Sequence, residues 1–191
     1  METKKLILII SIIVVLLGVV LFLRSSFIIK KEGKTTNLQL ISKNMIIESP
    51  AFKNNERIPQ KYTCDGKDIN PPLIISGIPE NAKSLALIVD DPDAPMKVWV
   101  HWLLWNIPAS ISEIKENSVP EEAVLGMNDF GRLEWGGPCP PSGTHRYFFK
   151  VYALDTNLDL PEGSRKEDLE KAMEGHILDF AQLIGLYSRK N

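Results

Sequence analysis

Residues 84–108 read SLALIVDDPDAPMKVWVHWLLWNIP, and this stretch decides the fold class. Its first six residues form a continuous apolar run, which is typical of a β-strand covered on both faces. Residues 98–107 are rich in β-branched and aromatic side chains and end at Pro108, so they predict a second strand. The aspartates and prolines between the two runs predict a rigid turn, because aspartate side chains bond turn amides and proline fixes φ.

The other apolar runs of the domain are short and end at proline or glycine, which indicates a mainly β protein. Residues 73–75 form one such run, between a proline pair and Gly77. Residues 146–154 read RYFFKVYAL and form another strand, with the odd-numbered side chains on one face and the even-numbered ones on the other. These runs predict a core built from several strands.

One segment has helical periodicity instead. Residues 164–167 read SRKE and fit a capping box, in which the serine hydroxyl and the glutamate carboxylate accept hydrogen bonds from exposed backbone amides. Five side chains then follow at helical spacing and predict an amphipathic helix: Leu169, Ala172, Met173, His176 and Ile177. Residues 181–188 fit either a helical exit or a final strand, and we expect the strand. The fold class is therefore an antiparallel two-sheet β-sandwich with one or two peripheral helices.

The beginning of the chain differs from the rest. Residues 6–23 read LILIISIIVVLLGVVLFL and carry no charge. A helix of this length spans ~27 Å, close to the ~30 Å hydrocarbon core of a bilayer. No small-x-small cleavage site follows, so we expect a single-pass N-terminal transmembrane helix, with secretion after signal cleavage as the alternative. The chain thus divides into an anchor or signal segment (1–24), a linker (25–43) and one folded domain (44–191).

Two signals on membrane orientation oppose each other. The basic residues that follow the apolar run outnumber those before it, which favours a cytoplasmic domain. The short start of the chain, with Lys4 and Lys5, is typical of an export signal, and we expect the domain outside the cytoplasm. The formal net charge is −2 and no basic stripe is visible, which argues against nucleic-acid binding.

Three stretches hold the residues that could carry chemistry. Residues 90–95 (DDPDAP) follow a strand, and taken alone they are a turn. His101 lies in an otherwise apolar strand, where alternation places it with Trp99, Leu103 and Trp105, and taken alone it is a core histidine with a hydrogen-bonding partner. Residues 135–147 (WGGPCPPSGTHRY) form a glycine- and proline-rich loop that places His145 at the start of a strand. Taken alone, this stretch is a rigid hairpin connection.

Together these motifs resemble the phosphatidylethanolamine-binding protein family, in its bacterial and archaeal Raf-kinase-inhibitor-like branch. The resemblance rests on DPDAP at 91–95, the histidine six residues later, and GPCPPSGTHRY at 137–147. It extends from about residue 46 to residue 187 and includes YTCDG at 62–66.

The resemblance implies a β-sandwich with a small pocket for phosphate-like anions. Six residues fall on its ligand-binding positions: Asp91, Pro95, His101, Gly137, His145 and Tyr147. Asp93 falls on a position that braces the first loop. Tyr187 falls where the C-terminal segment gates the pocket in some members.

The chemistry of these side chains fits an anion only in part. Histidine ring N–H groups and the bare amides of a glycine-rich loop donate to phosphoryl oxygens. The Asp91 carboxylate repels an anion unless it orients a histidine, favours imidazolium or shares a proton with the ligand. Two histidines with two aspartates also suit a zinc ion, but the resemblance favours an anion site without metal or other cofactor.

We therefore predict a non-enzymatic protein that binds phosphate or a phosphorylated headgroup, with recognition of a phosphorylated group on a protein target as a regulatory role. One alternative is an inhibitor of a protease or other enzyme, with the loop at residues 113–124 as the contact. A third is a weak hydrolase that uses the same pocket, although no activated nucleophile is evident. The oligomeric state stays open between a monomer and a homodimer.

Cys64 and Cys139 are the chain's two cysteines. In a domain outside the cytoplasm they are expected to pair, and two free buried thiols are the alternative. A bridge closes a loop of about 75 residues and stabilises the domain by about 4 kcal/mol in the loop-entropy treatment.

Overall fold

The structure, a computed structural model, describes residues 45–189. The expected anchor at residues 1–24 and the linker at residues 25–43 lie outside the described residues. Within residues 45–189, no helix has the length and apolar character needed to cross a membrane.

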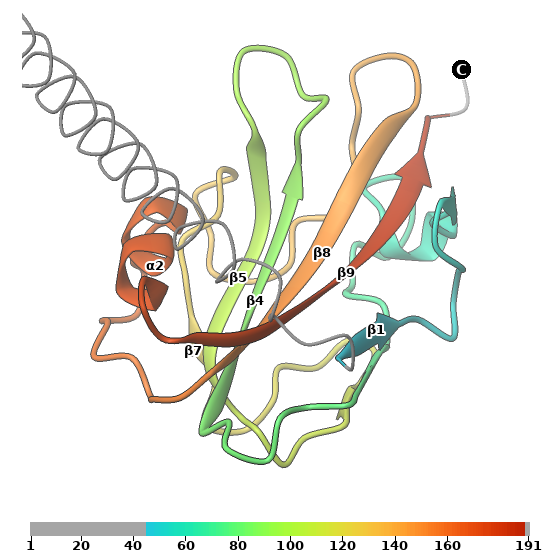
Figure 1. Cartoon of the computed structure of the whole chain (residues 1–191). Helices are drawn as coiled ribbons and strands as arrows, with labels where there is room; N and C mark the ends of the chain where they lie inside the picture. The colour runs from blue at the N-terminus through green and yellow to red at the C-terminus, as the bar shows by residue number, and fades with distance from the viewer. Residues whose placement is uncertain (1–44, 190–191) are drawn as a thin grey trace, which may run out of the picture. The chain divides into compact units, whose positions relative to one another are not determined.

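The larger of two sheets has six strands (Figure 1). In spatial order they are β2 (Glu56–Arg57), β9 (Ile177–Tyr187), β8 (His145–Leu154), β4 (Ser84–Asp91), β5 (Trp99–Pro108) and β7 (Val124–Leu125). All neighbours run antiparallel except β2 and β9, which pair in parallel. The prediction of a fully antiparallel fold is wrong at the edge formed by β2. The chain reaches β2 from a strand of the smaller sheet, and no hairpin joins β2 to β9.

The smaller sheet has three antiparallel strands in the order β1 (Ile46–Glu48), β3 (Leu73–Ser76) and β6 (Glu113–Ile114). The main hydrophobic core lies between the sheets, where Ile75 and Ile114 share one cluster with Leu87 and Phe149. A second cluster lies on the opposite face of the larger sheet, beneath α2 (Lys166–Met173). A short 3-10 helix, η1 (Gln60–Tyr62), precedes β3. The predicted mainly β fold with two sheets and a peripheral helix is confirmed.

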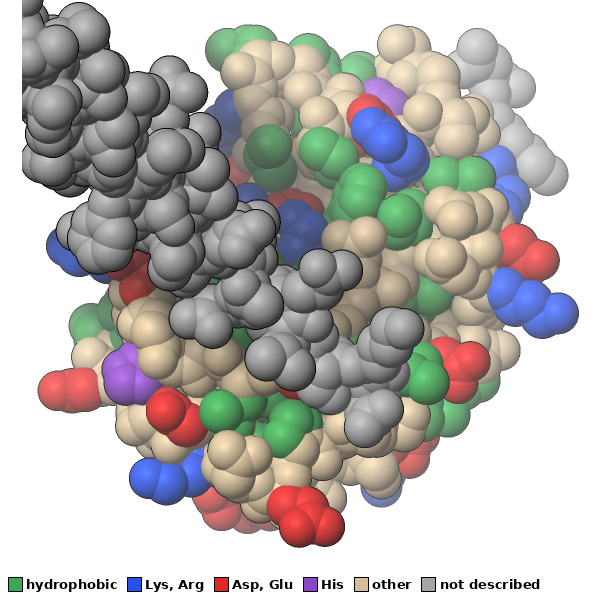
Figure 2. Space-filling view, viewed as in Figure 1, with side chains coloured by type: hydrophobic (Ala, Val, Ile, Leu, Met, Phe, Trp, Pro, Cys, Tyr) green, Lys and Arg blue, Asp and Glu red, His purple; other side chains and the backbone are tan. Residues whose placement is uncertain are grey.

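The burial of β4 and β8 follows the sequence patterns. Every residue of β4 is buried, as expected for a continuous apolar strand in the middle of a sheet. In β8 the odd-numbered residues are buried, whereas Arg146 is exposed and the next three even-numbered residues are half-buried, so the predicted alternation is confirmed. Figure 2 shows hydrophobic side chains exposed among charged ones on the outer face of β8 and β9, where Phe180 is 39% exposed.

The predicted helix is real but shorter and begins later. It begins at Lys166 and ends at Met173, and β9 follows from Ile177. The predicted cap at Ser164 is wrong, because its hydroxyl donates to the Pro161 carbonyl at 2.7 Å. The Asp168 carboxylate accepts from the backbone N–H of Arg165 instead.

The helical stripe ends early for a local reason. Gly175 has a φ of 80°, a left-handed conformation that ends α-helices and that glycine adopts at little cost. His176 and Ile177 therefore do not extend the helical stripe, contrary to the prediction. The expectation of a final strand at residues 181–188 is confirmed, since β9 covers residues 177–187.

A β-bulge interrupts β5 opposite Asp90. The register pairs Val89 with Trp102 and Asp90 with Val100, so His101 has no partner residue in β4. Such an extra residue bends the strand and re-aims its side chains.

The bulge changes the face on which His101 lies. Its ring packs edge-on against Tyr147 at 5.1 Å between ring centroids, on the face toward the main core. Leu103 and Trp105 belong to the cluster beneath α2. The prediction that His101 shares a face with these two residues is therefore wrong, because simple alternation ignores the bulge. Trp99 does accompany His101.

Asp90 is a fully buried carboxylate on the α2 side of the sheet. Its oxygens accept from the ammonium group of Lys150 on β8 and that of Lys166 on α2, each at 2.7 Å. The two lysines are largely buried, with side chains 22% and 15% exposed. This ion cluster ties the helix to the end of β4.

We expect Asp90→Asn to lower the free energy of unfolding by about 3 kcal/mol, because it leaves two partly buried ammonium groups without their counter-charge. Urea-induced unfolding followed by tryptophan fluorescence measures the change. Asp155→Asn is the matched control, because Asp155 pairs with His176 where both side chains are 46% exposed, and it should cost under about 1 kcal/mol. Equal losses in the two variants would contradict the role of the buried cluster.

Candidate functional site

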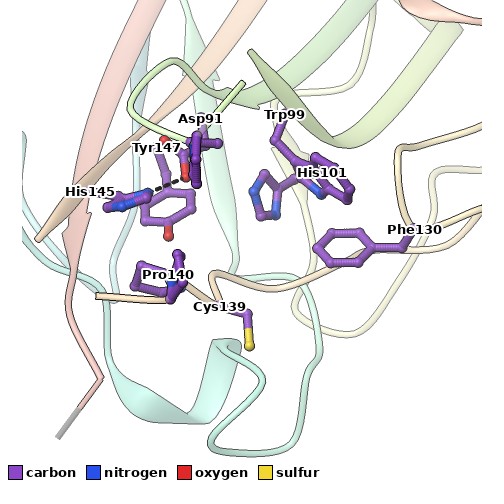
Figure 3. A pocket seen from close by; sticks show the side chains of 11 residues that line it. Asp91, Trp99, His101, Phe130, Cys139, Pro140, His145 and Tyr147 are labelled. Carbon is purple, nitrogen blue, oxygen red and sulfur yellow. Dashed lines mark hydrogen bonds and ion pairs between the residues drawn. The ribbon is translucent and has the colours of Figure 1, made fainter. Parts of the chain in front are cut away.

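A cavity of about 220 Å³ opens at the ends of three central strands of the larger sheet, β4, β5 and β8 (Figure 3). Because β4 is antiparallel to both neighbours, its end lies beside the beginnings of β5 and β8. Eleven residues line the cavity: Asp91, Ala94, Pro95, Trp99, His101, Phe130, Cys139, Pro140, Pro141, His145 and Tyr147.

Five of the six predicted ligand-binding residues line this cavity: Asp91, Pro95, His101, His145 and Tyr147. Gly137 does not line it, and neither do Asp93 and Tyr187, which were expected to support the site. The structure thus brings together residues that are up to 56 positions apart in the sequence, from Asp91 to Tyr147.

Asp91 orients His145. Its carboxylate Oδ2 lies 2.7 Å from the ring Nδ1, and both side chains are nearly buried, at 4% and 10% exposure. The other oxygen, Oδ1, accepts from the backbone N–H of Asp93 at 2.8 Å. Both carboxylate oxygens are therefore engaged by donors of the protein.

His101 is held in a comparable way by the backbone. Its Nδ1 donates to the carbonyl oxygen of Gly136, and the residue is 2% exposed. Burial lowers the pKa of His101 below its ordinary value of 6.5, although the Gly136 carbonyl and the Asp91 charge act in the opposite direction. The ring is therefore neutral at pH 7.

The two histidines consequently offer the cavity the same ring atom. In each ring Nδ1 faces a fixed acceptor, which places a proton on Nδ1 and leaves Nε2 for a ligand. A neutral ring accepts a hydrogen bond at Nε2, and a protonated ring donates one. Within residues 45–189, no group of three His, Cys, Asp or Glu residues lies close enough to hold a metal ion.

Two other donors in the cavity lining have no partner. The Tyr147 hydroxyl and the Trp99 indole Nε1 are both buried, and neither makes a hydrogen bond within the described residues. Burial, followed by the charge of Asp91, raises the pKa of Tyr147 above its ordinary value, so the hydroxyl keeps its proton. Buried donors are nearly always paired, which makes this pair a sign of a missing acceptor.

Asp93 braces the loop between β4 and β5. Its carboxylate accepts from the guanidinium of Arg146 at 2.6 and 2.8 Å and from the backbone N–H of Arg146 at 2.9 Å. Hydrogen bonding to Arg146 lowers the pKa of Asp93 to about 2, despite an opposing effect of burial. The first loop is thereby fastened to the start of β8.

Gly137 lies behind the cavity wall. Its backbone N–H donates to the Asp68 carboxylate at 2.7 Å, and the same carboxylate pairs with Arg132. A Cβ atom at this position would lie 2.5 Å from the Asp68 oxygen and 2.6 Å from the Tyr62 carbonyl oxygen, so the close approach requires glycine. Asp68 was not predicted, because nothing in its local sequence indicates a partner 69 residues away.

Tyr187 ends β9 beside His145, its partner in the strand register. The residue is 1% exposed, and its hydroxyl donates to the Asp65 carboxylate at 2.8 Å. Its side chain therefore fastens the end of β9 to the loop after η1 and does not line the cavity.

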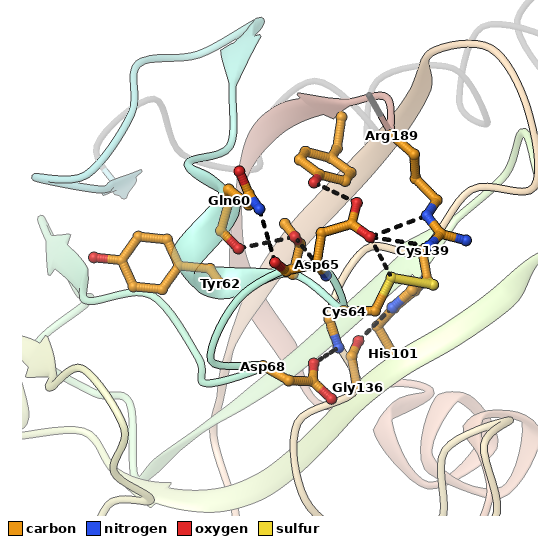
Figure 4. Close-up of a disulfide and its surroundings, with 12 residues drawn as sticks. Gln60, Tyr62, Cys64, Asp65, Asp68, His101, Gly136, Cys139 and Arg189 are labelled. Carbon is orange, nitrogen blue, oxygen red and sulfur yellow. Dashed lines mark hydrogen bonds and ion pairs between the residues drawn. A yellow bond between two sulfur atoms is a disulfide. The ribbon is translucent and has the colours of Figure 1, made fainter. Parts of the chain in front are cut away.

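Cys64 and Cys139 form a disulfide with a Cα–Cα distance of 5.5 Å (Figure 4). Cys139 contributes to the cavity lining together with the two prolines that follow it. The bridge thus links the loop after η1 to the wall of the cavity.

Sequence reasoning missed several lining residues, among them Phe130, Pro140 and Pro141. Trp99 could have been predicted as a lining residue, since the alternation of side chains along the strand places it on the same face as His101. Phe130 comes from an irregular loop, and its ring lies edge-on to His101 at 5.3 Å, a contact that no local pattern indicates.

Comparison with known proteins yields consistent matches. Residues 48–188 match the family described as phosphatidylethanolamine-binding protein. The UPF0098 protein of Methanothermobacter thermautotrophicus is 56% identical over 150 residues, which cover 76% of this chain and 99% of that protein.

Two crystal structures are similar across the same region. A putative phosphatidylethanolamine-binding protein homologue from Chlamydia trachomatis has a TM-score of 0.75 and 43% identity, with 78% of this chain and 100% of that chain covered. E. coli YbcL, described as a member of the mammalian PEBP family, has a TM-score of 0.73 and 32% identity, with 77% and 99% covered.

We expect Arg146→Gln to raise the pKa of Asp93 from about 2 toward its ordinary value of 3.8, because the guanidinium stabilises the carboxylate. In the native protein this pair stabilises the fold above pH 3.8, and its contribution is lost as the pH falls toward 2. Carboxyl chemical shifts in an NMR pH titration measure the pKa. Arg132→Gln is the control, because Arg132 pairs with Asp68 instead and should leave the titration of Asp93 unchanged.

Proposed function

Because this chain belongs to the phosphatidylethanolamine-binding protein family, in its prokaryotic UPF0098 and YbcL-like branch, we propose that its cavity binds a small oxyanion. The ligand would be phosphate or the phosphate group of a phosphorylated headgroup or side chain. The observation that carries this proposal is the pair of buried, unpartnered donors, Tyr147 Oη and Trp99 Nε1.

A phosphoryl group complements these two donors. Its oxygens are acceptors, and each buried donor left unpaired costs about 1–3 kcal/mol, so an acceptor-rich ligand recovers that free energy. The backbone around Tyr147 and Trp99 is held by the strand ladders of β8 and β5, so both donors are preorganised. Preorganised donors bind with little loss of conformational entropy.

The buried Asp91 carboxylate sets the charge of the acceptable ligand. A fully ionised phosphate would be repelled unless His145 or His101 carries a second proton. A singly protonated phosphate monoester is repelled less, because it carries one negative charge instead of two. Its P–OH group can donate to a histidine Nε2 while its other oxygens accept from Tyr147 and Trp99.

The shape of the cavity limits the ligand to a small group. At about 220 Å³ it is smaller than the roughly 300–1,000 Å³ of sites that enclose drug-sized ligands. Phe130, Pro140 and Pro141 provide apolar surface around the polar residues. A phosphate with a short substituent fits this description, and the remainder of a larger molecule would stay outside.

We propose binding rather than catalysis. None of the eleven lining residues is a serine or threonine, and the lining cysteine is bonded in a disulfide. Asp91 and His145 form a hydrogen-bonded pair without an adjacent side-chain nucleophile. A water-based hydrolysis would be recognised by release of product from the same ligands.

We further propose that the domain works outside the cytoplasm, tethered by the apolar segment at residues 6–23. A disulfide between Cys64 and Cys139 supports an oxidising compartment, because such bonds are rare in reducing ones.

We expect Tyr147→Phe to weaken the binding of phosphate and phosphoethanolamine by about 10-fold or more, because a hydrogen bond to a charged group contributes about 1.5–3 kcal/mol. Isothermal titration calorimetry measures the affinities. The free energy of unfolding should stay within about 1 kcal/mol of the native value, since the hydroxyl has no partner in the protein.

Tyr152→Phe is the matched control, because that hydroxyl lies on the outer face of β8 and away from the cavity lining. Unchanged affinity in Tyr147→Phe would reject the assigned donor. Release of phosphate from phosphoethanolamine by the native protein would replace the binding function with hydrolysis.

We expect sulfate to bind more tightly as the pH falls from about 8 to 5, the range in which histidines titrate. Sulfate itself does not titrate there, so the change reports on the protein. Burial holds the pKa of His101 below 6.5, and an anion favours its protonated form, so affinity should still be rising at the lower end of the range.

His101→Asn should flatten the acidic part of this profile, whereas His176→Asn, far from the cavity lining, should leave it unchanged. A sulfate affinity that is constant from pH 8 to 5 in the native protein would contradict the proposed role of the histidines.

A further inference from the structure

One wall of the cavity belongs to a short loop, residues 139–144, which we call the wall loop. Its first three residues, Cys139, Pro140 and Pro141, line the cavity. The loop ends at His145, where β8 begins and the pairing with β9 holds the chain.

The segment before the wall loop, residues 135–138, is held by five hydrogen bonds, two of which join the backbone of Gly136 to His101. The Trp135 indole donates to the Tyr62 carbonyl, and the Gly137 amide donates to Asp68. The Pro138 carbonyl accepts from the Cys64 amide at 3.2 Å. These contacts end at residue 138.

The wall loop itself has no such contacts. Among the described residues, no hydrogen bond or ion pair joins residues 139–144 to another part of the domain. Pro140 is buried by packing, and the Cys64–Cys139 disulfide is the one covalent cross-link of this loop in the described part of the chain.

The other end of the disulfide is well anchored. Cys64 lies between the fully buried Thr63, whose hydroxyl donates to the Gln60 carbonyl, and Asp65. The Asp65 carboxylate accepts from the Tyr187 hydroxyl and from the guanidinium of Arg189 (Figure 4). The bridge thus connects a loop without hydrogen bonds to a point that is fixed by β9.

The bridge is also accessible. Cys64 is exposed and Cys139 is half-buried. The sulfur of Cys139 points away from the other labelled side chains of the cavity (Figure 3). A thiolate can therefore approach the bond without entering the cavity.

We propose that this disulfide is a redox switch of the pocket: oxidation completes the wall, and reduction releases residues 139–144 and weakens anion binding. The inference rests on the proposed anion-binding function. An external dithiol, such as a thioredoxin-type protein, attacks through its thiolate and forms a mixed disulfide. It leaves as its own disulfide after giving up two electrons and two protons, and Cys64 and Cys139 remain as thiols.

The geometry predicts a partial effect. Pro140 and Pro141 restrict the released loop, because proline fixes φ. The donors Tyr147 and Trp99 belong to strands that the bridge does not hold. Reduction should therefore loosen one wall and leave both the fold and the donors in place, so that a protein still in a reducing compartment binds its ligand weakly.

The test compares oxidised and reduced full-length protein with sulfate as the probe. We expect calorimetry to give a Kd about fivefold higher or more after reduction with dithiothreitol, because the loop must then be ordered on binding. The Cys64→Ser/Cys139→Ser variant should bind like the reduced protein and should not respond to dithiothreitol. Backbone order parameters from 15N relaxation should fall at residues 142–144, and the hydrogen-bonded amides of Gly136 and Gly137 serve as the internal control.

The outcomes separate the two proposals. Absence of sulfate and phosphate binding by the oxidised protein would reject the anion-binding function itself. Binding that is equal in both redox states, with unchanged order parameters in the wall loop, would reject the switch alone. Loss of native circular dichroism in both the reduced protein and the serine variant would also reject it, because the bridge would then support the whole domain rather than the wall.

Discussion

Two consecutive buried carboxylates at the end of β4 are the constraint on which the rest of the site depends. Asp90 and Asp91 are 0% and 3% exposed, and their side chains point to opposite faces of the sheet. Burial of an ionised carboxylate is costly unless donors or cations compensate it. The fold therefore supplies Lys150 and Lys166 on one face and His145 on the other. These partners fix α2, β8 and β4 relative to one another.

The same constraint shapes what the cavity can bind. Each Asp91 oxygen already accepts a hydrogen bond from the protein, so the carboxylate orients His145 and holds the start of the first loop. The bulge opposite Asp90 brings His101 onto this face, where burial keeps its ring neutral at pH 7. The site thus combines one compensated negative charge with neutral donors.

Local sequence patterns predicted what depends on neighbouring residues. The continuous run of β4 and the alternation of β8 predicted their burial, because a strand's side chains follow a period of two. Alternation failed at His101, since a bulge depends on the partner strand. The cap at Ser164 failed because Asp168 competes for the same helix end. Asp68 was missed because its contact with Gly137 joins two distant loops.

The motif resemblance located the pocket but did not tell which of its residues line the cavity and which support the wall from behind. It grouped Gly137 and Tyr147 as ligand-binding residues, yet Gly137 lies behind the wall, whereas Tyr147 lines the cavity and its buried hydroxyl has no partner. The difference lies in the hydrogen-bond partners of each group, which the structure shows and the sequence does not. A buried donor paired with a carboxylate serves the fold, whereas an unpaired donor on a cavity-lining residue is a candidate for ligand binding. Trp102 Nε1 is also buried and unpaired, but Trp102 belongs to the main core and does not line the cavity. Under the proposed anion-binding function, Tyr147 and Trp99 are the fixed donors of the site, and the two histidines offer Nε2 to the same ligand.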